Sequence, residues 1–439
     1  MTTARSVAAQ TLMKIETKDA YSTLALNGLL KEQPLTSEKD TALAARLVYG
    51  VTERKLTLDY QLSLYLKEPI KKLRPAVLTC LRMGAYQILF MDKIPSRAAV
   101  NESVALVKSL GAVYASGMVN AVLRRIAEKG LCLLPEQPDN MFFLSVKYSC
   151  PIPLLSHFIK CYGRDNTEQH LSASLCERPL FIRRNTLACT EEELRSALEK
   201  DGASVLYRSP EGCGILQAHG DITGLAAFKQ GMFHVQDLSS QIDVQLLGAK
   251  PGQTVVDCCA APGGKSFTAA QYMRNSGNLI ACDQYPGKTE LIEIGARRLG
   301  IKNITTICEN AALLWKKGIA ADAVLCDVPC SGFGVIGRKP EIRYKDPAQF
   351  EDLPETQYSI LESGARMVRP GGTLVYSTCT LNPAENEEVC RRFSVEHPEF
   401  VLSSDPSYRE ITGGDYLTVF ASPEGGDGFF AAKFERKLA

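Results

Sequence analysis

Two cysteines of this chain lie where a thiol could act as a nucleophile. Cys330 lies in the segment Asp-Val-Pro-Cys-Ser-Gly at residues 327–332, and Cys379 lies in Tyr-Ser-Thr-Cys-Thr at residues 376–380. Each segment follows a short apolar run typical of a buried strand. Side chains just beyond the carboxyl ends of parallel strands face the ligand crevice of an α/β sheet. The two thiols could therefore meet in one site, and the residues alone leave open which of them attacks.

The elements that would position these cysteines form a repeating strand–helix pattern. Strands separated by helical connections predict a doubly wound parallel sheet. Two further strand-like segments near the C-terminus, at 416–420 and 429–432, predict an antiparallel hairpin. The strand-like segments of the predicted parallel sheet are 254–257, 279–282, 304–307, 323–326 and 373–376.

The first of these strands runs into a turn of small residues, Asp-Cys-Cys-Ala-Ala-Pro-Gly-Gly-Lys-Ser at 257–266. Such a turn lets the backbone approach a ligand closely, and the helix that follows offers N–H donors. The turn fits neither the G-x-G-x-x-G nor the P-loop pattern, so by itself it is weak evidence for any one cofactor. Asp283 ends the second strand, where a carboxylate can accept hydrogen bonds from ribose hydroxyls or serve as a turn residue.

Residues 1–130 predict a separate all-helical domain, because apolar residues recur along them at three- and four-residue spacing. Ser37 and Ser96 are its predicted N-caps. The basic residues of this domain form either a solvated helix surface or an RNA-facing patch. They are Arg46, Arg54, Lys55, Lys71, Lys72, Arg74, Arg82, Arg124 and Arg125.

Two segments join the helical domain to the predicted sheet. Residues 131–178 predict linker helices, and residues 179–235 predict a small α+β unit whose helix is capped at Thr190. Arg183 and Arg184 lie on the first strand of that unit. They are either contacts to RNA phosphates or surface residues of an edge strand.

Size, charge and cysteine content limit the classes of function. The 439 residues predict two or three domains, and 50 Lys and Arg nearly cancel 49 Asp and Glu, so a nucleic-acid partner would need a local basic face. No run reaches the ~18 uncharged apolar residues of a membrane helix, so no membrane partner is expected. The 15 cysteines without C-x-x-C spacing predict reduced thiols and no metal site. The first residues lack a secretion-signal pattern, and we expect a reducing cytoplasm.

Three motifs in this order, Pro-Gly-Gly-Lys-Ser, Asp-Val-Pro-Cys-Ser-Gly and Thr-Cys-Thr, resemble the cytosine-C5 RNA methyltransferases of the Nol1/Nop2/Sun family. The helical domain resembles the NusB RNA-binding fold, and the combination is similar to bacterial small-subunit (16S) rRNA methyltransferases. The resemblance spans nearly the whole chain and implies a multidomain fold. Its parts are an all-α NusB-like N-terminal domain (1–130), linker helices (131–178), a small α+β RNA-positioning subdomain (179–235) and an α/β Rossmann-like class I domain dependent on S-adenosylmethionine (236–439).

The resemblance implies S-adenosylmethionine as the methyl donor and no metal. Asp283 would bind the ribose hydroxyls, Asn310 would stand beside the adenine in place of the usual acidic residue, and Asp327 would adjoin the cofactor. Arg338 and Lys339 lie in a loop where the family has two arginines and a histidine, and they would contact RNA. The loop that would wrap the methionine and ribose comprises Cys259, Ala260, Ala261, Pro262, Gly263, Gly264 and Lys265.

Cytosine C5 is a poor nucleophile until a thiolate adds to C6 and makes C5 enamine-like. A free cysteine thiol, with a pKa of about 8.5, is mostly protonated at neutral pH, and Lys265 is the candidate cation that would favour the thiolate. Asp327 could bind the N3/N4 edge of the base and stabilise the adduct. The resemblance assigns the attack to Cys379 and the release of the product to Cys330, whereas the chemistry alone does not choose between them.

The expected partner is small-subunit rRNA, single-stranded or unstacked at the target because the base must leave its stack to reach the thiol. The chain is expected to act as a monomer. One alternative is a DNA cytosine-C5 methyltransferase that attacks from Cys330. Another is a non-catalytic RNA-binding factor of ribosome assembly or antitermination, which the presence of Lys265, Asp283, Asp327 and both cysteines disfavours.

Overall fold

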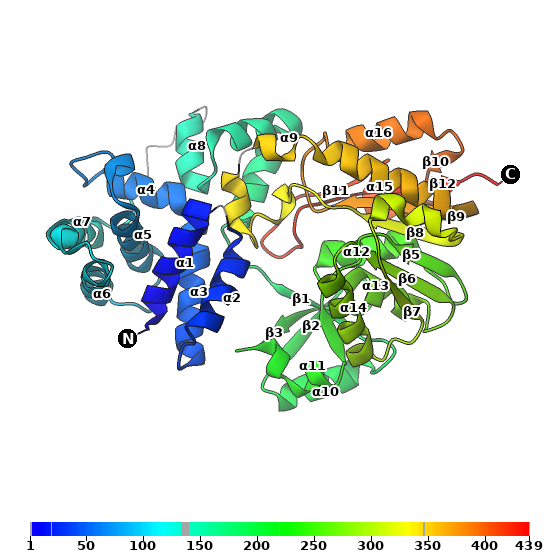
Figure 1. The fold of residues 1–439 in the computed structure, drawn as a ribbon, viewed down its shortest axis with the longest axis horizontal. Coiled ribbons are helices and arrows are strands. Elements are labelled where there is room, and N and C mark those ends of the chain that lie inside the picture. The colour runs from blue at the N-terminus through cyan, green and yellow to red at the C-terminus, as the bar shows by residue number, and fades with distance from the viewer. Residues whose placement is uncertain (1, 19, 133–139, 219, 346, 439) are drawn as a thin grey trace. The chain divides into compact units, whose positions relative to one another are not determined.

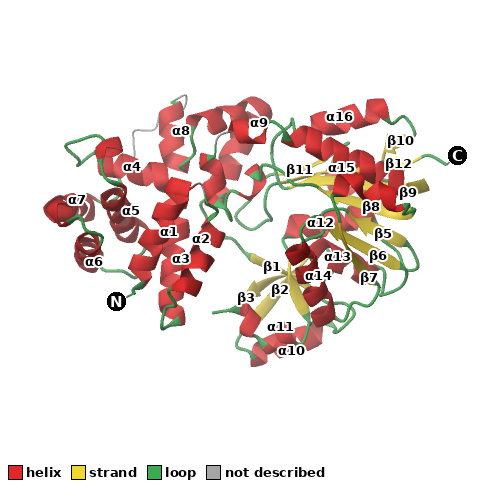
Figure 2. Cartoon of the chain, viewed as in Figure 1, coloured by secondary structure: helices red, strands yellow, loops and turns green. Residues whose placement is uncertain are grey.

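The computed structural model describes residues 2–18, 20–132, 140–218, 220–345 and 347–438 (Figure 1). The chain forms two compact units. Unit 1 comprises Met1–Cys176 and Ile336–Pro347, and unit 2 comprises Glu177–Val335 and Ala348–Ala439. Among the described residues, unit 1 is built from helices, whereas unit 2 combines helices and strands (Figure 2).

The helices of unit 1 follow the predicted apolar spacing. Ser37 caps α3 as predicted, because its side chain accepts a hydrogen bond from Asp40 N. Ser96 is instead the first residue of α6, and Pro95 takes the N-cap position. The helices are α1 (Ala4–Lys18), α2 (Ser22–Glu32), α3 (Glu38–Glu53), α4 (Lys55–Ser63), α5 (Pro75–Phe90), α6 (Ser96–Ser109), α7 (Ser116–Lys129), α8 (Met141–Tyr148) and α9 (Ile152–Ala173).

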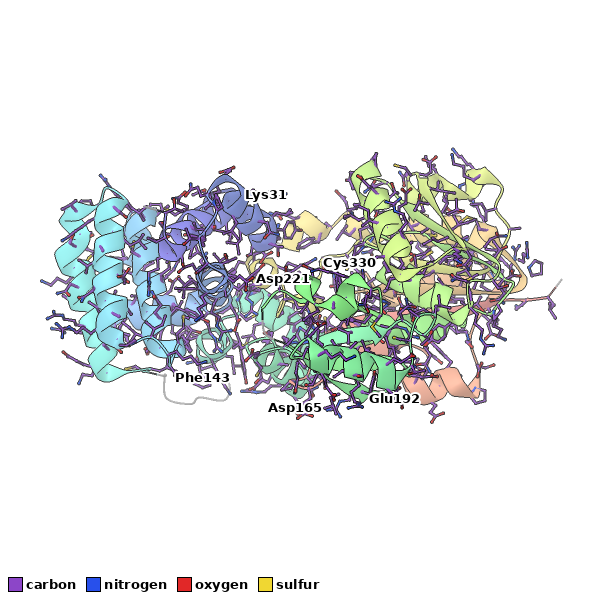
Figure 3. All side chains as sticks on the ribbon, turned by 90° about the horizontal axis from the view of Figure 1, so that it is seen from below. Lys31, Phe143, Asp165, Glu192, Asp221 and Cys330 are labelled. Atoms are coloured by element: carbon purple, nitrogen blue, oxygen red, sulfur yellow. The ribbon has the colours of Figure 1, made fainter. Side chains whose placement is uncertain are left out.

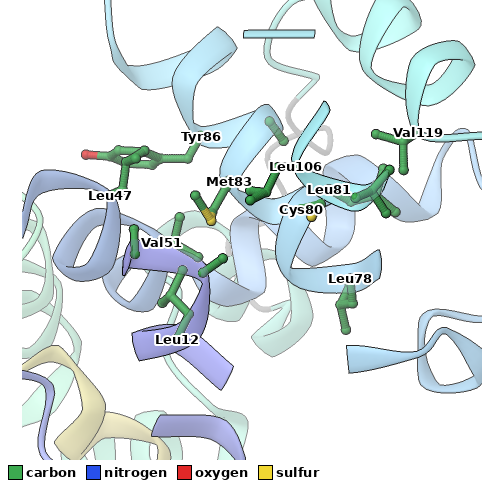
Figure 4. Packing of buried hydrophobic residues seen from close by; sticks show 14 of the residues in the cluster. Leu12, Leu47, Val51, Leu78, Cys80, Leu81, Met83, Tyr86, Leu106 and Val119 are labelled. Carbon is green, nitrogen blue, oxygen red and sulfur yellow. The ribbon is translucent and has the colours of Figure 1, made fainter. Parts of the chain in front are cut away.

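Apolar side chains of α1, α3 and α5 meet in the core of unit 1 (Figure 4). Leu12, Leu47 and Met83 are buried there, and each such side chain contributes about 1.5–3 kcal/mol by leaving water. The ring of Tyr86 lies against Gly50, where a Cβ atom would come within 2.0 Å of it. Only glycine on α3 therefore allows this approach of α5.

Two segments that were expected outside the helical domain belong to unit 1. The predicted linker contributes α8 and α9, while its residues 133–139 lie outside the described residues. Residues 336–347 also belong to unit 1, although they lie in sequence between strands of unit 2. Buried Arg343 donates to the carbonyl oxygens of Tyr148 and Ile336, at 3.1 and 3.2 Å. The sequence did not predict this placement, because a short 3-10 segment carries no apolar periodicity.

Unit 2 begins with a small antiparallel sheet in the order β2-β3-β1-β4, which confirms the predicted α+β subdomain. The Thr190 capping box at the start of its helix is also present. Ile182, Leu194 and Phe233 are buried in the core beneath the sheet. Its elements are β1 (Leu180–Arg184), α10 (Glu191–Lys200), β2 (Ser204–Arg208), β3 (Cys213–Gln217), α11 (Ala226–Lys229) and β4 (Phe233–Val235).

The larger sheet of unit 2 has the order β10-β12-β9-β8-β5-β6-β7, with β11 paired to β12. Strands β9, β8, β5, β6 and β7 are parallel, as predicted, and β11 pairs with β12 as the predicted antiparallel hairpin. Its strands are β5 (Thr254–Asp257), β6 (Asn278–Asp283), β7 (Ile304–Cys308), β8 (Ala321–Asp327), β9 (Val368–Thr378), β10 (Phe400–Leu402), β11 (Leu417–Val419) and β12 (Phe429–Arg436).

Helices cover both faces of this sheet, because successive residues of its buried strands point to opposite sides (Figure 1). Val255 packs with one face, whose helices are α12 (Leu238–Leu247), α13 (Gly264–Tyr272) and α14 (Pro286–Leu299). Val256 packs with the other face, whose helices are α15 (Leu353–Met367) and α16 (Glu387–Glu396). The strand order reverses between β5 and β8, so the ligand crevice is expected at their carboxyl ends.

Candidate active site

The two cysteines meet beyond the ends of neighbouring strands. Asp327 ends β8 and pairs with Ser377 of β9. Cys330, which Figure 3 labels, lies in the loop after β8, and its Sγ is 3.2 Å from Cys379 Sγ in the loop after β9. Their mutual hydrogen bond and burial raise the pKa of Cys330 well above its ordinary value. Either sulfur can be the donor of this hydrogen bond, so a proton that stays on one thiol stabilises a thiolate on the other.

A buried carboxylate holds the two cysteine loops in place. Glu385 accepts hydrogen bonds from Ser331 N at 2.9 Å and from Ser331 Oγ at 2.5 Å. Ser331 Oγ also lies 2.7 Å from Thr380 Oγ1 in the other loop. Gln357 of α15 donates to both Glu385 and the carbonyl of Pro329, at 2.9 and 3.0 Å. The thiols thus sit on loops that are fixed by hydrogen bonds.

Lys265, the second residue of α13, lies between two carboxylates. Its ammonium group pairs with Asp243 of α12 and, at 2.8 Å, with Asp327 of β8. Ser377 Oγ lies 3.4 Å from the same ammonium, and the ring of Phe429 lies 4.8 Å from it. Burial would lower the pKa of Lys265, but the charges of the two carboxylates outweigh burial and raise it. Lys265 is thus a permanent cation, and its charge is held by carboxylates.

A pocket of about 300 Å³ opens at the switch between β5 and β8. Cys259 and Ala261 of the glycine-rich turn line it, together with Asp283, Asn310 and Asp327. Asp283 is buried, its Oδ1 accepts a hydrogen bond from Tyr285 N at 3.1 Å, and Lys288 Nζ lies 3.7 Å from its Oδ2. Asn310 caps the following 3-10 turn by accepting from Ala312 N at 3.0 Å. Five of the sequence-predicted cofactor residues therefore line one pocket.

The turn itself depends on a glycine and a buried acid. Gly263 has a φ of 111°, and a Cβ atom there would lie 2.3 Å from the Phe267 ring, so only glycine fits. Asp257 accepts a hydrogen bond from Ser266 Oγ at 2.7 Å, which ties the end of β5 to α13. Burial raises the pKa of Asp257 to about 7. A smaller pocket of about 170 Å³ on the other side of the turn is lined by Pro262, Gly264 and Lys265, among others.

The two arginines of β1 that were predicted to contact RNA are buried. Arg183 is 1% exposed, and it donates to Gln271 Oε1 at 3.1 Å and to the carbonyl of Glu211 at 3.0 Å. Arg184 is also buried and donates to the carbonyl of Cys189 at 2.6 Å. Arg184 bonds within the small subdomain and Arg183 links β1 to α13, so their burial does not support the expected phosphate contacts. Both residues lie on β1, which is a central strand between β3 and β4 and not an edge strand.

Of the remaining basic residues, some are buried in ion pairs and others are exposed on the surface. In unit 1, Arg82 is buried and bonded to Asp59 and Glu16, so it is not part of an RNA-facing patch. Lys339 is exposed and Arg338 is half-buried in the segment that belongs to unit 1. Exposed members of the predicted patch are Arg46, Lys71, Lys72, Arg74, Arg124 and Arg125.

The fold and the site define a class: an α/β domain with a pocket at the switch point of its sheet and a pair of thiols beyond the ends of β8 and β9. Residues 244–435 match the 16S rRNA methyltransferase RsmB/F family, and residues 2–128 match the NusB family. The chain is 35% identical to the probable ribosomal RNA small subunit methyltransferase B of Bacillus subtilis (strain 168), over 99% of each chain. It is 34% identical to the protein of the same name from Synechocystis sp., over 99% of this chain and 100% of the relative.

A solved structure has the same architecture over its whole length. The crystal structure of PH0851 superposes with a TM-score of 0.79 and 26% identity, and covers 99% of each chain. The chain therefore belongs to the RsmB/F family of 16S rRNA methyltransferases, with a NusB-type N-terminal region. In the part of the chain that the structure describes, no helix is long and apolar enough to cross a membrane.

Several side chains of the site were missed by sequence reasoning. Asp243 lies in α12 and carried no signal, because a single acid in an amphipathic helix is normally a solvated residue. Ser377 precedes the Thr-Cys-Thr motif and Glu385 follows it, but the sequence assigned no role to either. Gln357 could not be found, because only the packing of α15 brings it to the cysteine loops.

Proposed function

We propose that this chain methylates C5 of a cytosine in 16S rRNA, with S-adenosylmethionine as the methyl donor and a covalent bond between Cys379 and C6 of the base. The observation that carries the proposal is the pair of thiols 3.2 Å apart, on fixed loops, beside the Lys265–Asp327 ion pair. A methyl transfer to a ring carbon with a covalent adduct needs one sulfur to attack and a second group to assist release. The two thiols supply both.

The hydrogen bond between the two thiols supports a division of labour between them. The thiol that keeps its proton can stabilise the adjacent thiolate and take part in proton transfer when the adduct collapses. The family resemblance assigns the attack on C6 to Cys379 and the release step to Cys330. In the release step a base removes the C5 proton, the C5=C6 double bond re-forms, and the electron pair of the S–C6 bond returns to Cys379.

Asp327 and Lys265 are suited to hold the base. The Asp327 side chain is 31% exposed, so it can reach a base in the crevice, and Lys265 anchors its Oδ1 from the buried side at 2.8 Å. A carboxyl group fixed in this way binds the N3/N4 edge of cytosine without reorganising during the reaction. An ordinary surface aspartate would have to lose its hydration shell and choose a rotamer first.

The residues around the larger pocket fit S-adenosylmethionine, which supplies an electrophilic methyl group when it is bound. Asp283 offers a buried carboxylate to two ribose hydroxyls, and Asn310 offers an amide to the adenine. Backbone groups of the turn from Cys259 to Lys265 line the space for the methionine part. The donor and acceptor types of the pocket thus match the parts of the cofactor, and the chain acts as a monomer in this proposal.

Transfer of a tritiated methyl group to unmethylated small-subunit rRNA, followed by nucleoside analysis, tests the proposal. We expect 5-methylcytidine as the product, no product from Cys379→Ala, and a trapped protein–RNA adduct from Cys330→Ala. The same methyl-transfer assay is run in parallel with DNA as the substrate. Absence of 5-methylcytidine, or methylation of DNA that requires Cys330 and not Cys379, would overturn the proposal.

A further inference from the structure

The two cysteine loops meet at more than the thiols. Ser331 Oγ lies 2.7 Å from Thr380 Oγ1, so the residues that directly follow the two cysteines are also in contact. Gly334 N donates to the carbonyl oxygen of Cys379 at 3.0 Å. A Cβ atom at Gly334 would lie 2.7 Å from that oxygen, so the loops pack as closely as a glycine allows. The separation of 3.2 Å between Cys330 Sγ and Cys379 Sγ is therefore set by the backbone of both loops.

Two sulfur atoms at this separation need little movement to form a bond. The sulfurs of a disulfide lie about 2.05 Å apart, so Cys330 Sγ and Cys379 Sγ would have to approach each other by only about 1 Å. Rotation about the Cα–Cβ bonds of the two cysteines can supply a movement of this size. Both thiols are half-buried, so a small molecule can reach them. The pair thus combines proximity with access.

We propose that Cys330 and Cys379 are a modification site, at which a hydroperoxide such as H2O2 oxidises the two thiols to an intramolecular disulfide that a dithiol reduces again. Formation of the disulfide follows from the geometry of the sulfurs and does not depend on the proposed function. Its consequence for catalysis rests on that function, because a sulfur bonded to the other cysteine cannot add to C6 of a cytosine. Oxidation therefore switches methyl transfer off, and reduction switches it on.

The atoms and electrons of the oxidation balance. The thiolate of one cysteine attacks an oxygen of H2O2, the O–O bond breaks, and the sulfur becomes a sulfenic acid while hydroxide leaves and takes up the proton that the thiol lost. The second thiol attacks the sulfenic sulfur, the S–S bond forms, and the hydroxyl group leaves as water with the proton of that thiol. Two thiols and one H2O2 thus give one disulfide and two waters. The product is the same whichever sulfur reacts first, and the hydrogen bond between the sulfurs stabilises the attacking thiolate.

A second pair of thiols in unit 2 separates proximity from access. Cys258 Sγ lies 3.8 Å from Cys326 Sγ, so these two sulfurs are also neighbours. Both residues are 0% exposed, and both belong to the apolar core that α15 covers. A Cβ atom at Gly364 of α15 would lie 2.6 Å from Cys326 Sγ, so the helix packs directly against this sulfur. Buried thiols of this kind are inert, and the pair is an internal control for the accessible one.

The first test treats the reduced full-length protein with H2O2, blocks the remaining thiols and assigns the linked cysteines by tandem mass spectrometry. We expect Cys330 and Cys379 to lose their thiols together and to appear as one link within a single chain, which dithiothreitol removes. The link should form faster as pH rises, because the thiolate is the attacking form. Separate sulfinic acids on the two cysteines, or a link between Cys258 and Cys326 in their place, would overturn the proposal.

Cys330→Ser and Cys379→Ser each remove one partner of the pair. The sulfenic acid on the remaining cysteine then has no thiol beside it, so we expect it to persist and to be labelled by a cyclic diketone that reacts with sulfenic acids. Cys308→Ser is the matched control, because it removes an exposed thiol at the end of β7 and should leave the link between the pair intact. Equal labelling of the pair in the wild type and in the two variants would contradict the proposal.

Methyl transfer to unmethylated small-subunit rRNA connects the disulfide to activity. We expect the rate of 5-methylcytidine formation to fall in proportion to the fraction of chains that carry the link, and dithiothreitol to restore it. A protein that methylates RNA when reduced but forms no link, or that stays active when linked, overturns the switch alone. A protein that forms the link but makes no 5-methylcytidine even when fully reduced overturns the proposed function instead, so the two failures are distinguishable.

Discussion

Each unit of the molecule contains a buried cation between two carboxylates, and the two clusters differ in charge balance. In unit 1, Arg82 binds Asp59 through two parallel hydrogen bonds, of 2.7 and 2.9 Å, and Glu16 through another of 2.9 Å. Lys55 lies 3.4 Å from Glu16, so two cations face two acids. In unit 2, Lys265 is the one cation that pairs with Asp243 and Asp327 among the residues that the structure describes.

The difference appears in the pKa values of the acids. Burial works against ionisation of Glu16, but the charges and hydrogen bonds of Arg82 and Lys55 outweigh burial, and the pKa of Glu16 falls below its ordinary value. Burial is also the largest influence on Asp243, and there Lys265 does not outweigh it, so the pKa of Asp243 rises. A balanced cluster holds helices together, whereas an unbalanced cluster is able to bind and release a proton.

Lys265→Met should give the largest effect. The substitution removes the countercharge that fixes Asp327, so we expect methyl transfer to fall by about 100- to 1000-fold, the range for a lost electrostatic group in a preorganised site. The protein should still fold, because Asp243 can take up a proton and remain neutral. Single-turnover 5-methylcytidine formation measures the rate, and circular dichroism checks the fold. A loss of less than about tenfold would show that the cluster is structural, like that of unit 1.

Arg82→Met should act on stability instead. Breaking a fully buried ion pair costs about 3–5 kcal/mol, but Asp59 and Glu16 are 21% and 33% exposed and can regain water. We therefore expect a loss of about 2 kcal/mol in the free energy of unfolding of unit 1. Urea denaturation followed by the fluorescence of tyrosines in unit 1 measures it. An unchanged urea midpoint would mean that this cluster does not stabilise the fold of unit 1.

The sequence predicted the residues of the candidate active site in unit 2 better than the ion-pair cluster of unit 1. Strand-end motifs brought Asp327, Cys330 and Cys379 to one place, because the ends of neighbouring parallel strands must meet. Arg82 was placed on a surface because helical spacing does not reveal which polar residues pack against other helices. The burial of Arg183 could not be predicted either, because only the strand order shows that β1 is central. Asp243 could not be found, because its role depends on where α12 packs.

Asp243→Asn should change stability in a pH-dependent way. The folded pKa of Asp243 is raised, so the folded state binds its proton more tightly than the unfolded chain. The wild type therefore loses stability as pH rises from the ordinary carboxyl range through the raised value, and the uncharged amide does not. We expect the variant to be more stable than the wild type above this window by about 1 kcal/mol, and to match it in acid. Thermal unfolding across pH measures the difference. A stability advantage of the variant that is larger in acid than in base would reverse the assignment.

Glu16→Gln should give the smallest effect and the opposite sign. The folded pKa of Glu16 is lowered, so its stabilisation is present above the unfolded carboxyl pKa and is lost as pH falls through the folded value. Because the side chain is 33% exposed, solvent screens the pair, and we expect a loss of only about 0.5 kcal/mol at neutral pH. The same thermal scans should show the deficit vanish in acid, where the wild-type acid is also neutral. If Glu16→Gln instead stabilised the protein at neutral pH, the charge balance of the two clusters would not be what separates a structural site from a proton-binding one.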